Sequence, residues 1–163
     1  MSADVIVRLA GIEAQNLIVL IDELVEVVDA EGADADPGVA RLTPDAYPDD
    51  AQASAEFEQA TRATLIDRRR ADARIVRRTL EPIADLADAE DAPLREHRLT
   101  LDDEQTDAWM RTLAAMRLVV ATRVGITDAD EHDVDDPAFH VYDWLGYRLE
   151  LLVRAADERD LSR

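Results

Sequence analysis

The side chains best suited to acid–base chemistry are a histidine and an aspartate near the carboxyl end of the chain. His140 and Asp143 stand at i and i+3, a spacing that brings two side chains together on one face of a helix. A general base also needs a nucleophile or an electrophile beside it. Ser54 and the other serines lie in no Gly-x-Ser-x-Gly turn. We interpret the pair as a helix-surface contact and predict no catalytic residue.

An acidic segment superficially suggests a calcium loop, because such loops place oxygen ligands at alternating positions. The match fails at two positions: Asp133 stands where the sharp turn needs glycine, and Phe139 stands where a bidentate glutamate is needed. No histidine has a glutamate three residues before it, as the Glu-x-x-His motif of di-iron bundles requires. We therefore predict a solvated acidic loop, with no metal and no cofactor. Its candidate ligands are Asp128, Asp130, Glu131, His132, Asp133, Asp135 and Asp136.

The residue types that are missing exclude several mechanisms. The chain contains neither lysine nor cysteine, so it has no Schiff-base or P-loop lysine, no thiol nucleophile and no disulfide. Its 37 acids and 18 arginines give a formal charge of −19. Nucleic-acid backbones and anionic membranes repel such a charge, so we expect neither as a partner. GC-rich codon usage explains the arginine bias; the acid-rich surface of a halophile is the alternative.

A basic stripe interrupts this acidity. Arg70, Arg74 and Arg77 fall on one face of a predicted helix. Internal ion pairs are the structural interpretation. The functional interpretation is a docking face for an acidic partner, a phosphate group or the acidic loop of a second subunit, which would make the protein a homodimer. The exposed loop around Tyr47 is a second candidate contact.

Arg117 is a separate case because it falls within the apolar run from Met116 to Val120. A guanidinium placed there is at least partly buried and needs a carboxylate partner. Asp143 and then Asp50 are the candidates for this structural ion pair.

The elements that must position these residues are helices. Apolar residues recur at three and four over four segments, of which Asp103 to Val124 reads as the central helix. Gly125 fits its carboxyl cap, and Asp136 fits the amino cap of the last helix. Asp49 is the expected amino cap of the second segment. The sequence does not decide whether this segment forms one helix or two. The segments are Ile12 to Asp29, Ala51 to about Leu80, Asp103 to Val124, and Pro137 to about Asp157.

Breakers and branched residues complete the predicted fold. Proline, glycine and acids mark loops near 31–50, 82–101 and 127–136, with Pro82 opening the second. Val5 to Leu9 is rich in branched residues and Arg98 to Leu101 alternates, so the two can pair as a ribbon; alternatively, the first segment begins the first helix. The sequence predicts a mainly α, single-domain bundle (1–163) of four to five helices. With no signal peptide or transmembrane stretch, we expect a cytoplasmic protein.

Several fragments stand in a distinctive order and spacing: Arg41 to Asp50, Glu56-Phe57, Thr61, Trp109 to Val120, Thr122 to Ile126, and Val141 to Leu145. Together they resemble an uncharacterised actinobacterial family, the domain-of-unknown-function family numbered two thousand and seventeen. The resemblance implies a small, mainly helical cytoplasmic protein, often encoded beside the adaptor of the Clp protease. A partner linked to Clp proteolysis is therefore an expectation from resemblance alone. The family supplies no catalytic residues.

Two functional hypotheses follow. The first is a non-enzymatic protein-interaction or regulatory module that uses Tyr47 or the arginine stripe. The second is a metal-assisted, carboxylate-dependent enzyme, for which acids are plentiful but organised ligands are not seen. We prefer the first because no catalytic constellation is visible.

Overall fold

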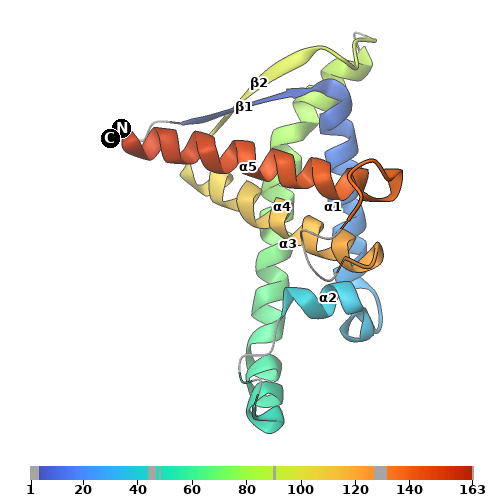
Figure 1. Cartoon of the computed structure of the whole chain (residues 1–163). Coiled ribbons are helices and arrows are strands. Elements are labelled where there is room, and N and C mark those ends of the chain that lie inside the picture. Colours follow the sequence, from blue (N-terminus) through green and yellow to red (C-terminus); the bar gives the residue numbers. More distant parts are fainter. Residues whose placement is uncertain (1–3, 44–46, 48, 90, 127–131, 163) are drawn as a thin grey trace.

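The computed structural model describes residues 4–43, 47, 49–89, 91–126 and 132–162. These residues form a mainly helical bundle with a small antiparallel ribbon, as the sequence predicts (Figure 1). In chain order the elements are β1 (Val5–Ala10), α1 (Gly11–Asp29), the short 3-10 helix η1 (Ala33–Ala35), α2 (Pro37–Leu42), α3 (Ala51–Ala89), β2 (Glu96–Leu101), α4 (Asp103–Arg123), the 3-10 helix η2 (Pro137–Phe139) and α5 (His140–Leu161).

The predicted ribbon forms. β1 and β2 are antiparallel, with Val5 opposite Leu101 and Arg8 opposite Arg98. Val5, Leu9 and Leu101 are buried, so the pleat turns one apolar face inward. A two-stranded ribbon is marginal alone. Here β1 contacts α5 and α1, and β2 contacts α4.

Helix α4 is the central element, as its apolar character predicts. It contacts α1, α2, α3, α5 and β2. Trp109 and Leu113 are buried, and the indole Nε1 of Trp109 donates a 3.0 Å hydrogen bond to Oγ1 of Thr79. Leu145 is fully buried on α5, which lies across the bundle (Figure 1). The predicted cap holds too: Gly125 has φ +77°, and Ile126 N donates to Ala121 O.

Helix α3 is one helix and is longer than predicted. It spans 39 residues, about 58 Å at 1.5 Å per residue. The loop expected from Pro82 begins only after Ala89. Pro82 cannot donate to the carbonyl one turn earlier, but the turns after it bury Ile83, Ala84 and Ala87. This packing outweighs one lost hydrogen bond, so the proline is tolerated inside the helix.

The two halves of α3 have different environments. From Ile66 onward the helix buries residues at heptad-like spacing against the bundle, including Ala73, Val76 and Leu80. Over 51–65, all described, Ser54 alone is buried. Figure 1 shows this amino-terminal half projecting past the rest of the bundle. The cap is Asp50 and not Asp49, because Oδ1 of Asp50 accepts from Ala53 N at 3.0 Å.

The loop expected over 31–50 contains unpredicted structure. Oδ1 of Asp36 accepts hydrogen bonds from the backbone of Gly38 and Val39, and Pro37 occupies the first turn. The resulting helix α2 buries Val39 and Leu42 and contacts α4. A helix this short is unstable alone, so docking on α4 decides its formation.

No helix within the described ranges is long and apolar enough to pass through a bilayer.

Candidate functional site

Arg117 lies on α4 where α5 covers it. Its side chain is half-buried, and Nε is buried with no hydrogen-bond partner. The guanidinium carbon lies 4.1 Å from the centroid of the Tyr142 ring, within cation–π range. A Cβ built on Gly146, one turn further along α5, would lie 2.9 Å from Nε and 3.3 Å from the guanidinium carbon. The guanidinium is therefore held against the tyrosine ring and the glycine.

The ion pair expected of Arg117 with Asp143 or Asp50 is not found among the described residues. Asp143 bonds His132, with 2.6 Å between Oδ1 and Nε2. Asp50 caps α3. The electron-rich face of Tyr142 takes the place of a carboxylate beside Arg117.

A cavity of about 290 Å³ opens beside Arg117. Arg41, from α2, and Arg117 line it, and no described acid does. Its other walls include Leu118, Ile126 and Leu149. The site thus combines two cations with an aliphatic surface in a chain of formal charge −19.

The histidine that pairs with Asp143 is His132 rather than His140, which is exposed. The His132 side chain is only 8% exposed, and its ring meets Tyr142 edge-on at 5.4 Å between centroids. Its second nitrogen, Nδ1, is buried without a partner, so no described hydroxyl bonds the imidazole. The pair therefore lacks the nucleophile of a catalytic triad.

The acidic segment shows no metal centre in its described part. Oδ1 of Asp133 accepts from Asp135 N, and Oδ1 of Asp136 accepts from Ala138 N. Asp128, Asp130 and Glu131 lie outside the described residues. Within the described ranges, no three His, Cys, Asp or Glu side chains are grouped to hold a metal ion.

The arginine stripe is largely engaged inside the molecule. Arg70 pairs with Asp29 of α1 and with Asp67, and Arg77 pairs with Asp22 of α1 and with Glu81. Arg74 is exposed and has no partner among the described residues. Because the paired acids and the paired arginines are each seven residues apart, the two ion pairs brace α1 and α3 in antiparallel register.

These ion pairs perturb the two arginines. The hydrogen bond to Asp29 raises the pKa of Arg70, and the hydrogen bond to Asp22 raises the pKa of Arg77. Both guanidinium groups therefore stay charged near neutral pH.

Asp72, which is buried, forms an ion pair with the half-buried Arg111 that the sequence patterns did not predict. Asp72 is 5% exposed, and it accepts two hydrogen bonds, from Nε at 2.7 Å and from Nη2 at 2.9 Å. The hydrogen bond to Asp72 raises the pKa of Arg111. The available signal was the position of Asp72 beside Ala73 and Val76 on the core-facing stripe of α3.

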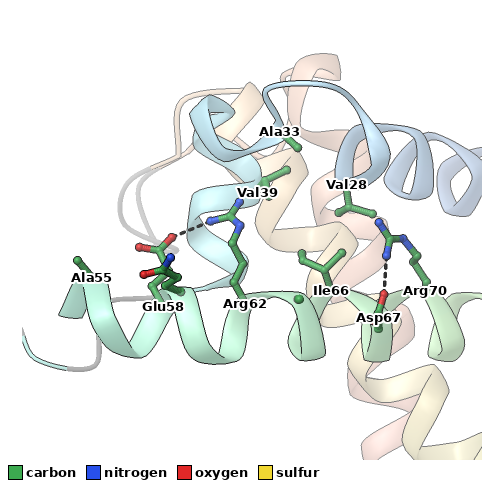
Figure 2. Close-up of a pocket in the computed structure, with 11 residues that line it drawn as sticks. Val28, Ala33, Val39, Ala55, Glu58, Arg62, Ile66, Asp67 and Arg70 are labelled. Atoms are coloured by element: carbon green, nitrogen blue, oxygen red, sulfur yellow. Dashed lines mark hydrogen bonds and ion pairs between the residues drawn. The ribbon is translucent and has the colours of Figure 1, made fainter. Parts of the chain in front are cut away.

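A second, larger cavity of about 650 Å³ forms a groove along the projecting half of α3. Figure 2 shows its apolar residues Val28, Val39 and Ile66 together with charged side chains of α3. The charged residues are Glu58, Arg62, Asp67 and Arg70, of which Glu58 pairs with Arg62 and Asp67 pairs with Arg70 (Figure 2).

Tyr47 precedes α3 and lies away from the groove. The residue is 51% exposed, and its ring meets Phe57 edge-on, with 6.2 Å between the ring centroids. Its backbone is tied to the first turns of α3, because the hydroxyl of Ser54 donates to Tyr47 O and accepts from Tyr47 N. Neither Tyr47 nor Phe57 lines the groove.

Comparison with known proteins identifies a family without an assigned activity. The family model described as a domain of unknown function, DUF2017, matches residues 1–156. No curated protein and no solved structure matches the chain. Since the match covers nearly the whole chain, the protein belongs to the DUF2017 family.

Proposed function

We propose that this protein is a protein-binding module whose groove along α3 receives a basic, amphipathic helix of a partner. The observation that carries the proposal is the groove itself: about 650 Å³, with Val28, Val39 and Ile66 as apolar lining. Helix-in-groove recognition uses apolar side chains at helical spacing that insert into such a surface. Ala55 and Ala63 line the same groove and are exposed, so a partner helix can approach α3 closely.

The charges favour a basic partner. The groove arginines Arg62 and Arg70 already pair with Glu58 and Asp67. The side chain of Asp67, although paired with Arg70, remains 72% exposed, and Asp67 lines the groove. A molecule of charge −19 attracts cationic partners and speeds their association. A second copy would carry the same charge, so repulsion disfavours a homodimer through this face.

The arginine stripe (Arg70, Arg74 and Arg77), which the sequence suggested as a docking face, contributes less to this proposed partner binding than the groove does. Arg70 and Arg77 are engaged with α1, which leaves Arg74 as the exposed cation. Tyr47 and Phe57 present a separate aromatic surface that a partner could extend over.

The test uses two tryptophan variants of α3. Ala63→Trp fills the groove, whereas Ala60→Trp adds the same bulk at an exposed position outside it. The probe is a synthetic helical peptide with leucines on one face and lysines on the other. NMR titration of the labelled protein should shift resonances of Val39 and Ile66. Ala63→Trp should weaken binding at least tenfold, and Ala60→Trp should leave it unchanged.

Two controls complete the experiment. A peptide of the same composition with its leucines scrambled should bind weakly, because it has no apolar face. Sedimentation should show a monomer; a dimer that Ala63→Trp disrupts would make a second copy the occupant and overturn the basic-partner proposal. Binding that is equal for both peptides, or unaffected by Ala63→Trp, would also reject it.

A further inference from the structure

We infer that the cavity between α4 and α5 binds a small amphiphilic carboxylate, with Arg117 as its anchor. This site is separate from the α3 groove, because the two cavities share no lining residue. A test of this inference is therefore independent of a test of the proposed function.

The first argument is electrostatic. The chain has about two acids for every arginine, yet neither arginine at this cavity has a carboxylate partner among the described residues. Within the described part of the chain, Nη1 of Arg41 donates a hydrogen bond to the hydroxyl of Thr122, at 3.3 Å. Neighbouring Arg123 pairs with Asp36 at 3.2 Å, so acids are within reach of this part of the surface. Two guanidinium groups that face one cavity without a described carboxylate partner leave a local positive site for an anion.

The second argument is preorganisation. Gly146 leaves the space in which the guanidinium lies. The ring of Tyr142, a residue that is only 3% exposed, supports the guanidinium. That ring is held edge-on by His132, whose own position is fixed by Asp143. Because the cation is held in place before a ligand arrives, binding would not need to order a long, flexible side chain.

The chemistry of the walls selects the ligand. A guanidinium presents paired N–H donors that match the two oxygens of a carboxylate. Leu118, Ile126 and Leu149 supply an apolar surface beside it. The cavity, about 290 Å³, is near the lower limit of small-molecule sites. A carboxylate on a short branched chain satisfies both features, whereas inorganic phosphate leaves the aliphatic walls uncovered.

The probe is 4-methylpentanoate, with 4-methylpentanamide as its uncharged control and inorganic phosphate as the purely ionic control. Titration of the full chain, followed by NMR, should shift the Nε resonance of Arg117 and the amide of Gly146 with the carboxylate. The amide and phosphate should bind at least tenfold more weakly. Arg117→Gln should weaken the affinity for 4-methylpentanoate at least tenfold. Arg154→Gln, which changes an exposed arginine of α5, should leave the affinity unchanged.

A further arm distinguishes two sources of the same chemistry. A short peptide ending in a free leucine carboxylate is compared with its carboxy-amidated form. Tighter binding of the free-acid peptide than of 4-methylpentanoate assigns the site to a chain terminus, and the reverse assigns it to a free acid; either supports the inference. Should Arg117→Gln unfold, the Nε shift in the unaltered protein decides alone. No carboxylate-specific shift, or binding that survives Arg117→Gln in a folded variant, overturns it.

Discussion

The guanidinium of Arg117 lies where a side chain at Gly146 would have to be: a Cβ on the glycine would lie 2.9 Å from Nε of the arginine. Alanine is normally the better helix former, by about 1 kcal/mol. At this position the added methyl group must push the guanidinium away from the ring of Tyr142. The glycine is thus explained by its neighbour across the helix interface and not by helix propensity.

The first prediction is a reversal of sign at Gly146. In the unaltered protein, Gly146→Ala should lower the free energy of unfolding by about 1 kcal/mol, as overpacking does. In an Arg117→Ala background the same change should raise it by about 0.5–1 kcal/mol, because only the helix propensity remains. Urea unfolding of the four proteins measures both. An equal effect in the two backgrounds would show that the side chains are not coupled.

The second prediction concerns the buried pair Asp72 and Arg111. Asp72→Ala should lower the free energy of unfolding by about 3 kcal/mol, because it leaves the partly buried guanidinium of Arg111 without its bidentate partner. Asp107→Ala is the matched control: Asp107 also lies near Arg111, but at 4.0 Å and 67% exposed. It should cost less than about 0.5 kcal/mol. Chemical denaturation compares the two, and similar costs would contradict the assignment of the buried pair.

The third prediction is a pH dependence set by Glu13, which joins the start of α1 to α5. Burial alone would raise the pKa of this carboxyl, but hydrogen bonds from Arg148, Ala10 N and Trp144 outweigh burial and lower it. A lowered folded-state pKa contributes stability that is present above the unfolded value of 4.5 and is lost as the pH falls through the folded value.

Glu13→Gln tests this contribution. At pH 7 the variant should be less stable by about 2 kcal/mol, a typical value for hydrogen bonds to a charged group. The difference from the unaltered protein should shrink as the pH falls below 4.5, because the carboxyl of the unaltered protein then becomes protonated too. Unfolding curves at pH 7 and at progressively lower pH measure the gap. A gap that is independent of pH would indicate a packing effect instead.

The fourth prediction separates the members of the arginine stripe. Arg70→Ala and Arg77→Ala should each lower the free energy of unfolding by about 1 kcal/mol, since each removes two partly exposed ion pairs. Arg74→Ala should stay within about 0.5 kcal/mol because Arg74 is exposed and has no described partner. Thermal unfolding ranks the three. Equal effects would show that helix propensity, not pairing, determines them.

Local patterns predicted the elements whose own residues decide them. The branched residues of Val5 to Leu9 predicted β1, the all-round apolar character of Asp103 to Val124 predicted α4, and Gly125 predicted its cap. Where tertiary contacts decide, the patterns misled. Pro82 marks a helix end locally, but the buried residues after it carry α3 onward. Helix α2 exists because α4 receives Val39 and Leu42.

The candidate site was predictable only in part. The apolar neighbours of Arg117 correctly indicated that its side chain is partly buried. Its surroundings could not be read from spacing, since Tyr142 and Gly146 come from α5 and Arg41 comes from α2. The same limit hid the pairing of Asp143 with His132 across eleven positions of sequence. Which arginines stay unpaired is a property of helix packing, and no local pattern encodes it.

The last prediction concerns salt. Even with every arginine paired, the formal charge of −19 remains, so the folded surface repels itself. Screening shortens the range of this repulsion from about 30 Å at 0.01 M salt to about 10 Å at 0.1 M. The melting temperature should therefore rise with sodium chloride over this range, because the relieved repulsion exceeds the weakening of partly exposed pairs such as Arg77 with Asp22.

The shape of the rise distinguishes two origins of the acidic surface. Saturation below molar salt would indicate ordinary screening and a composition set by codon usage, whereas a rise that continues into molar salt favours a halophilic source. Sodium chloride is the salt to use, because sulfate adds its own exclusion from the protein surface. A flat or falling melting temperature would mean that the ion pairs between α1 and α3 outweigh the repulsion. The prediction of a self-repelling surface would then be wrong, and Arg70→Ala with Arg77→Ala should restore the rise with salt.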